Sequence, residues 1–186
     1  MPIHMPKIGF VDCLSNAFDS FELATVIIEK NYAGTTLQRL TAPEILKIPV
    51  CAKKLLVGDA DAVVVFATAV PEADYDSLHL LLEKTIDLEV AHQKYVFYCV
   101  VSEEEFSSQA DFEIVASKRL DGVFDLVLKS LHSPAEVSNQ IGTGMDFSMF
   151  ASLAAGGANQ EQTQSATPAS PAMPASTNEE AGKSLF

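Results

Sequence analysis

The chain has 186 residues, of which 48 % are hydrophobic and 20 % charged, so it can bury the core of one ordinary domain. Its 25 acidic and 12 basic residues give a formal charge of −13, which repels polyanions and argues against a nucleic-acid partner. No apolar run reaches the roughly 20 residues of a membrane helix and no signal peptide opens the chain, so we expect a soluble, cytoplasmic protein without membrane contact.

Apolar runs and amphipathic segments alternate along the chain. The predicted strands are 7–12, 35–40, 62–68 and 95–101, and the predicted helices lie between and after them. The 62–68 run has no alternation, which is typical of a strand covered on both faces. Strands that alternate with helices imply right-handed crossovers. The sequence therefore predicts an α/β fold: a single three-layer αβα domain around a parallel sheet of about four strands, wound as in flavodoxin.

Capping residues and a proline mark where the helices should begin. Asp19 or Ser20 can cap the first helix, and Asp76 or Ser77 can cap the third. Pro49 suits the first position of the second helix, which leaves 42–48 as a loop ahead of it. The fourth helix is predicted over 112–127 from its apolar periodicity.

The C-terminal part of the chain differs from the rest in composition. After about residue 154 it consists mainly of Gly, Gln, Ser, Thr, Ala and Pro, which cannot offset the entropy of ordering by burial. We expect one domain over 1–150 and a disordered, low-complexity tail over 151–186. Cys13, Cys51 and Cys99 are odd in number, lie among apolar residues and lack metal-ligand spacing, so we expect reduced, buried thiols and no metal site.

One run carries a family resemblance. Residues 41–56, T-A-P-E-I-L-K-I-P-V-C-A-K-K-L-L, resemble V-P-G-x-F-E-I-P-L-A-A-K-K-L of lumazine synthases and V-P-G-I-K-D-L-P-V-A-C-K-K-L of archaeal-type riboflavin synthases. Residues 7–12, 72–79, 118–119, 132–137 and 142–144 also resemble the archaeal type, and 17–21 resemble the turn after strand one in lumazine synthases. The resemblance covers roughly 7–146. It implies a lumazine synthase-like fold, a homopentamer with sites between neighbours, a small lumazine substrate, and chemistry without a metal or redox cofactor.

In a doubly wound sheet the loops after the strands meet at the carboxyl edge, where such folds bind ligands. Phe18 follows the first strand and is either the stacking partner of a flat heterocycle or an ordinary core residue. The loop after the third strand brings Thr68 and Ala69, which could contact a ribityl chain. Lys118 and Arg119 are an adjacent basic pair that could hold an anion, or are solvated helix charges.

The loop after the second strand offers backbone groups that can recognise a pyrimidinedione edge. These groups belong to Ile45, Leu46 and Lys47, and Lys47 stands where the relatives have an acidic residue. Glu44 stands where the relatives have glycine, so it should strain the backbone, and it could restore the missing carboxylate or be a solvated surface residue. His79 falls on the archaeal histidine and could shuttle a proton near pH 7, or be a structural histidine on a helix.

The resemblance implies riboflavin biosynthesis. The leading hypothesis is a transferase, riboflavin synthase, which dismutates two 6,7-dimethyl-8-ribityllumazine molecules by moving a four-carbon unit from one to the other. The runner-up is 6,7-dimethyl-8-ribityllumazine synthase. A third hypothesis is a descendant without catalytic activity, which is either a pentameric scaffold or a protein that binds flavin or lumazine. The replaced glycines and Leu80, which stands in place of a glutamate, favour this hypothesis. A mononucleotide-binding flavodoxin is disfavoured because no phosphate-binding loop follows the first strand.

Overall fold

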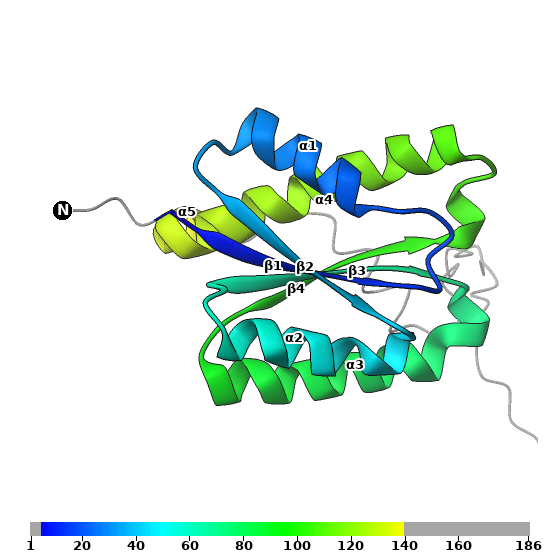
Figure 1. Cartoon of the computed structure of the whole chain (residues 1–186), viewed down its shortest axis with the longest axis horizontal. Coiled ribbons are helices and arrows are strands. Elements are labelled where there is room, and N and C mark those ends of the chain that lie inside the picture. The colour runs from blue at the N-terminus through cyan, green and yellow to red at the C-terminus, as the bar shows by residue number, and fades with distance from the viewer. Residues whose placement is uncertain (1–4, 140–186) are drawn as a thin grey trace, which may run out of the picture.

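The structure, a computed structural model, describes residues 5–139 and forms three layers (Figure 1). The elements in chain order are β1 (Lys7–Cys13), α1 (Phe21–Asn31), β2 (Thr36–Ala42), the 3₁₀ turn η1 (Ile45–Lys47), α2 (Ile48–Val57), β3 (Ala62–Ala69), α3 (Pro71–His92), β4 (Val96–Ser102), the 3₁₀ turn η2 (Glu103–Glu105), α4 (Gln109–His132) and α5 (Pro134–Asn139). The predicted tail over 151–186 and the 142–144 motif lie outside the described residues. Within the described part of the chain, no helix is long and apolar enough to cross a membrane.

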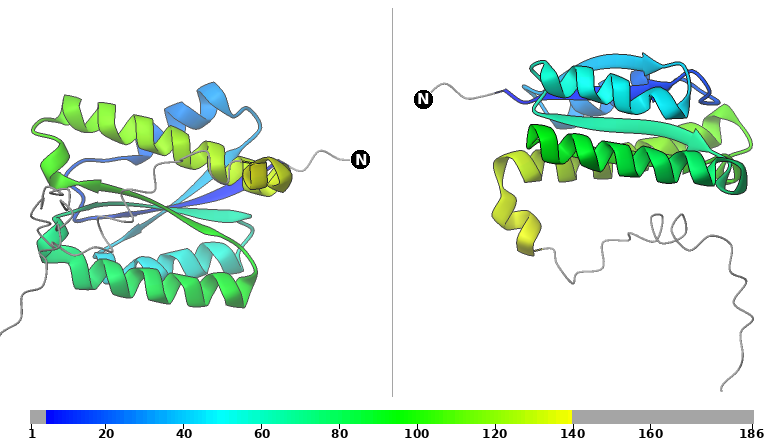
Figure 2. Two further views of the ribbon diagram at one scale, coloured as in Figure 1. Left: turned by 180° about the vertical axis from the view of Figure 1, so that it is seen from behind. Right: turned by 90° about the horizontal axis from the view of Figure 1, so that it is seen from below.

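The four strands form one parallel sheet in the order β2-β1-β3-β4, which confirms the predicted α/β class and its flavodoxin-like winding. Helices α1 and α4 cover one face, while α2 and α3 lie side by side on the other (Figures 1 and 2). All of β3 is buried. Its residues alternate between two separate core clusters, with Val64 and Phe66 on the α1/α4 side and Val63 and Val65 on the α2/α3 side.

Helix starts are where the sequence prediction is wrong. Helix α3 begins at Pro71, five positions before Asp76, because proline suits the first turn and the Asp74 carboxylate accepts from Val70 N at 2.8 Å. Helix α2 begins at Ile48 with Pro49 just inside it, and part of the predicted loop ahead of it is the turn η1. At α1, Ser20 holds the N-cap position without a side-chain bond, and the Asp19 carboxylate accepts from Phe21 N at 2.8 Å instead.

A close approach at Gly9 fixes helix α2 against the sheet. A Cβ built on Gly9 would lie 2.8 Å from Cδ1 of Leu55 on α2 and 3.1 Å from Cγ2 of Val63 on β3. A side chain at this position would therefore push α2 away from β1. Helix α2 follows directly from the segment that carries Glu44 to Lys47, so the position of α2 also sets the position of that segment.

The cysteines are free, as predicted, and two of the three are fully buried. Cys13 and Cys99 lie in the two cores, whereas Cys51 on α2 is only partly buried, which corrects that part of the prediction. Burial raises the pKa of the Cys99 thiol to about 12, so it stays protonated at neutral pH. Among residues 5–139 no group of three or more His, Cys, Asp or Glu side chains could hold a metal ion.

Candidate functional site

The sheet opens at its carboxyl edge between β1 and β3. These strands pair only as far as Val11 and Val65. Beyond that point β1 continues beside β2 to Cys13, and β3 continues beside β4 to Ala69. The chain leaves β1 toward one side of the sheet and later returns to its other side, so this opening is the topological switch point, the usual ligand site of such sheets.

The β1–α1 loop, residues 14–20, crosses this opening and is held to β3. The Asn16 carboxamide donates to the Phe66 carbonyl at 3.4 Å and accepts from Thr68 N at 3.0 Å. It thereby takes the place of the strand neighbour that β3 has lost. Ala17 N donates to the Thr68 hydroxyl at 3.2 Å, and that hydroxyl lies 3.3 Å from the Glu103 carboxylate. The loops after β1 and β4 are thus joined to β3 through Thr68, which is 3 % exposed and lies within the strand, not in the loop after it as the sequence predicts.

Phe18 lies in the same loop, among other aromatic rings. It is half-buried, with ring centroids 5.1 Å from Phe112 and 5.9 Å from Phe106. The ring therefore packs at the rim of the α1/α4 core and keeps part of its surface exposed at the carboxyl edge. Leu14, at the start of the loop, is 73 % exposed and is a second apolar surface there that the sequence analysis did not single out.

The segment after β2 lies on the other side of the sheet. Ile45 is buried, Leu46 is 45 % exposed, and Ala69 at the end of β3 is buried in the same α2/α3 core. Glu44 and Lys47 are both exposed and form an ion pair at 3.5 Å. Glu44 has φ −154° and ψ 163°, an extended backbone open to any residue, so the expected strain from replacing glycine is wrong.

His79 projects from α3 into solvent. Its ring lies parallel to that of Tyr75, one turn earlier, with centroids 6.3 Å apart and an interplanar angle of 8°. Turn η1 packs against α3, so the helix that carries His79 adjoins the segment that carries Glu44 and Lys47. These residues share the α2/α3 side of the sheet.

Lys118 and Arg119 have different surroundings. Lys118 is exposed on α4. Arg119 is partly buried, donates to the Val100 carbonyl at 3.0 Å, and forms an ion pair with Glu105. Arg119 thus ties α4 to β4 and η2, and only Lys118 presents its charge to solvent.

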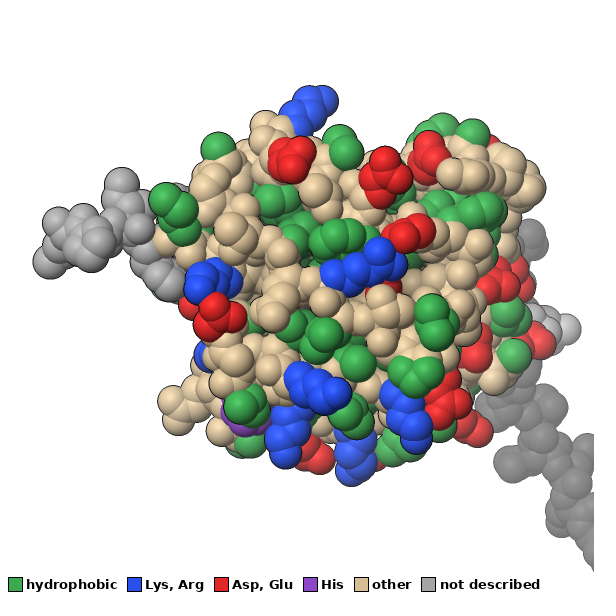
Figure 3. Space-filling view, in the orientation of Figure 1, with side chains coloured by type: hydrophobic (Ala, Val, Ile, Leu, Met, Phe, Trp, Pro, Cys, Tyr) green, Lys and Arg blue, Asp and Glu red, His purple; other side chains and the backbone are tan. Residues whose placement is uncertain are grey.

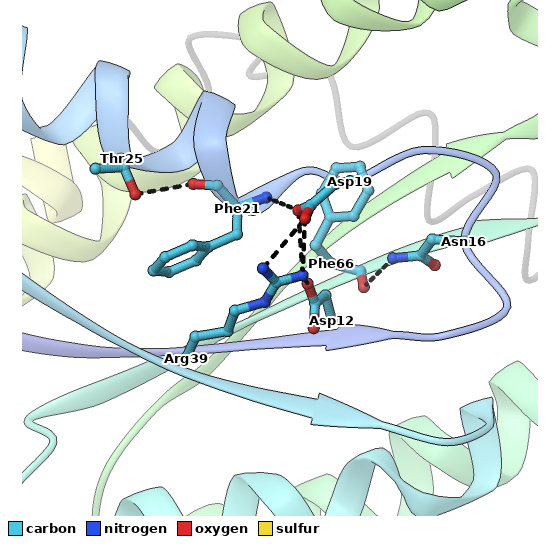
Figure 4. A network of polar contacts seen from close by, with 7 residues as sticks. All are labelled: Asp12, Asn16, Asp19, Phe21, Thr25, Arg39 and Phe66. Carbon is cyan, nitrogen blue, oxygen red and sulfur yellow. Dashed lines mark hydrogen bonds and ion pairs between the residues drawn. The ribbon is translucent and has the colours of Figure 1, made fainter.

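A polar network at the end of β1 was missed by the sequence analysis (Figure 4). Asp12 is 2 % exposed and accepts from Arg39 Nη2 at 2.5 Å, and Arg39 also contacts the exposed Asp19 at 3.1 Å. Burial lowers the pKa of Arg39, but the hydrogen bonds and charges of Asp12 and then Asp19 outweigh it and raise the pKa overall. The available signal was an aspartate next to the end of a mainly apolar strand, with an arginine in the neighbouring strand.

Acidic side chains gather on the right of Figure 3, the side on which the strands end. The segments that follow β3 and β4 carry the exposed Glu72 and Asp76 of α3 and the exposed Glu103, Glu104 and Glu105 of η2. The lysines Lys47, Lys53 and Lys54 are exposed along η1 and α2. The carboxyl edge on the β3/β4 side is therefore a negatively charged surface with apolar patches.

No protein-family model matches the chain. The chain is 25 % identical over 144 residues to a riboflavin synthase of Methanothermobacter marburgensis, and the match covers 76 % of this chain and 94 % of that protein. At this level of identity the chain is a distant relative of riboflavin synthases.

Proposed function

We propose that the protein acts in riboflavin biosynthesis as a riboflavin synthase that converts two 6,7-dimethyl-8-ribityllumazine molecules into riboflavin by four-carbon transfer. The observation that carries the proposal is the match across 94 % of a riboflavin synthase. A parallel sheet with an opening between β1 and β3 supports it, because such an opening is where a flat heterocycle usually binds.

Each candidate residue receives a role in this proposal. The exposed part of Phe18 stacks on one ring, and backbone groups of Ile45, Leu46 and Lys47 recognise the pyrimidinedione edge. The end of β3 at Thr68 and Ala69, whose side chains are buried, lies beside the ribityl chain. Lys118 offers the accessible cation of the α4 pair, while Arg119 holds η2 in place. His79 or Glu44 accepts the acidic methyl proton, and holding two flat ligands face to face supplies much of the remaining rate.

The test is incubation of purified protein with 6,7-dimethyl-8-ribityllumazine while flavin absorbance is followed. We expect flavin to accumulate, and His79→Ala to slow it by roughly 10²- to 10⁴-fold if His79 moves the proton. His132→Ala is the matched control, because His132 is an exposed histidine at the far end of α4. If the wild-type protein forms no flavin, the proposal is refuted. If it forms lumazine from an aminouracil and a four-carbon phosphate, the result favours 6,7-dimethyl-8-ribityllumazine synthase instead.

A non-catalytic lumazine or flavin binder is the second candidate. This candidate is favoured because three of the proposed ligand-binding side chains already contact other groups of the protein. Phe18 packs against two aromatic rings, the Thr68 hydroxyl is bonded to Ala17 and Glu103, and Arg119 forms an ion pair with Glu105. Tight binding of the lumazine without flavin formation would favour a non-catalytic binder over a riboflavin synthase.

We further propose that the chain assembles as a homopentamer. Leu46, Val50 and Val57 are 45 %, 53 % and 63 % exposed and follow one side of η1 and α2, next to the edge strand β2. An apolar stripe of this kind at a sheet edge is suited to contact with a second subunit. Sedimentation should give a species several times the 20.0 kDa of the chain, and a monomer at micromolar concentration would refute the assembly.

A further inference from the structure

Both arginines of the chain form ion pairs with carboxylates. Arg39 contacts Asp12 and Asp19, and Arg119 contacts Glu105. The planar fork of an arginine matches the oxygens of a phosphate, so an arginine that is paired with a carboxylate has to break that pair to bind one. Arg119 is also the arginine that the sequence analysis considers as a holder of an anion.

Glu105 contacts Arg119 through a carboxylate that is fixed at both oxygens. Oε1 of Glu105 accepts a hydrogen bond from Ser102 N at 3.1 Å, as part of the cap of η2, and Oε2 accepts from Nη2 of Arg119. The other terminal nitrogen of Arg119, Nη1, donates to the Val100 carbonyl at 3.0 Å. Both terminal nitrogens of the guanidinium therefore bond the protein itself, and Glu105 balances its charge.

This ion pair lies next to the residues proposed to contact the ligand. Turn η2 begins with Glu103, whose carboxylate is 3.3 Å from the Thr68 hydroxyl. Phe106 follows η2, and its ring centroid is 5.9 Å from that of Phe18. The side chains of the ion pair are 20 % exposed at the arginine and 35 % exposed at the glutamate, so both reach the surface beside the proposed site.

The surroundings of the ion pair are acidic. Turn η2 consists of three glutamates, against which Arg119 is the one cation bonded to it among the described residues, so the segment keeps a net negative charge. A phosphate group carries close to two negative charges near neutral pH and is repelled by such a segment. A neutral ligand is not.

We propose that Glu105 is a specificity-determining residue: by pairing with Arg119 it makes this end of the site reject phosphorylated ligands. The inference rests on the function proposed above, in which neither substrate nor product carries a phosphate. It follows that the site binds riboflavin in preference to flavin mononucleotide (FMN), which differs from riboflavin only by a terminal phosphate. The same pairing disfavours the four-carbon phosphate that 6,7-dimethyl-8-ribityllumazine synthase consumes.

The experiment measures the affinities of the full chain for riboflavin and for FMN by fluorescence titration, at low and at high salt. Glu105→Gln removes the charge that balances Arg119 and preserves the size of the side chain. Glu104→Gln is the matched control, because it removes the same charge from the same turn and leaves the Arg119–Glu105 ion pair in place. The double variant Glu105→Gln, Arg119→Gln removes the cation that the first substitution releases.

We expect wild-type protein to bind riboflavin roughly five- to tenfold more tightly than FMN. Glu105→Gln should strengthen only FMN binding, by a similar factor, the double variant should lose this gain, and Glu104→Gln should change FMN affinity much less. Salt should act in opposite directions. It should strengthen FMN binding to wild-type protein by screening a repulsion, and weaken FMN binding to Glu105→Gln by screening an attraction to Arg119.

Each contrary result has its own meaning. Equal affinity of wild-type protein for the two flavins would overturn the inference while leaving the proposed function standing, and so would an equal gain of FMN affinity in Glu104→Gln. If Glu105→Gln does not fold, the wild-type salt dependence decides, because FMN affinity that falls with salt would mean that a cation holds the phosphate. If wild-type protein binds neither flavin, this inference fails, and the proposed function fails with it only if the protein also forms no flavin from the lumazine.

Discussion

The aromatic cluster at the carboxyl edge gives the most discriminating prediction. Phe18 packs against Phe112 at 5.1 Å and Phe106 at 5.9 Å, yet keeps part of its ring exposed. Truncation of a fully buried phenylalanine to alanine costs roughly 3–5 kcal/mol. Because Phe18 is half-buried, we expect Phe18→Ala to lower the free energy of unfolding by about half of that, ~2 kcal/mol, including roughly 0.5–1.5 kcal/mol from each lost ring pair.

Two measurements on this one variant separate its roles. Urea denaturation gives the stability change, and ~2 kcal/mol should lower Tm by about 4–8 °C for a chain of this size. Titration with 6,7-dimethyl-8-ribityllumazine gives the affinity change, which should be roughly tenfold if the exposed part of the ring stacks on the ligand. Tyr95→Ala is the matched control, because Tyr95 is 58 % exposed and pairs with Phe97 at 5.9 Å, at the amino end of β4.

The outcomes of the Phe18→Ala experiment are exclusive. A stability loss with unchanged affinity would assign Phe18 to the core alone and remove the main aromatic contact from the proposed site. A large affinity loss with unchanged stability would mean that the packing against Phe106 and Phe112 contributes little. If neither quantity changed, the reasoning from this cluster would be refuted.

Three further substitutions or titrations test other parts of the structure. Gly9→Ala should lower stability by roughly 1–3 kcal/mol in urea denaturation, because its Cβ would press on Leu55, and an unchanged midpoint would contradict the close approach. Asn16→Ala should cost about 1–3 kcal/mol and weaken lumazine binding, since it removes both bonds to β3, and Asn16→Asp should recover only part of each. Burial raises the pKa of Tyr98 and of Cys99 to about 12, so their stabilisation should be complete below about pH 9 and decline toward pH 12. Tyr98→Phe should flatten that decline in alkaline unfolding curves.

The sheet could be predicted closely because its strands are continuous apolar runs. The predicted 62–68 strand is observed as Ala62–Ala69, and all of it is buried, as the absence of alternation indicated. Helix starts were predicted less well, since the prediction relied on side-chain caps near Asp76. The chain uses Pro71 and the carboxylate of Asp74 instead, and which of several acidic residues bonds the first N–H depends on local geometry.

The site was harder to predict, because the sequence shows which loops meet but not which side chains touch. The separation of β1 and β3 after Val11 and Val65 depends on how far each strand pairs with its other neighbour. Because the two strands separate there, Asn16 can form hydrogen bonds with β3, and Thr68 is surrounded by protein groups. Arg119 was predicted as a site cation from its position beside Lys118, but its contacts with Val100 and Glu105 depend on tertiary packing.

The sheet itself divides the candidate residues into two groups. Phe18 and Thr68 lie on the α1/α4 side with Asp12, whereas Glu44 and His79 lie on the α2/α3 side. A ring that reaches both groups has to pass over the carboxyl ends of β1 and β3, where the strands separate. The alternative is that each group faces a different subunit, which agrees with an apolar stripe on η1 and α2 beside the second group. In either arrangement the proposed proton acceptor and the proposed stacking ring come from opposite layers of the fold, so correct packing of both layers on the sheet is a condition for the proposed reaction.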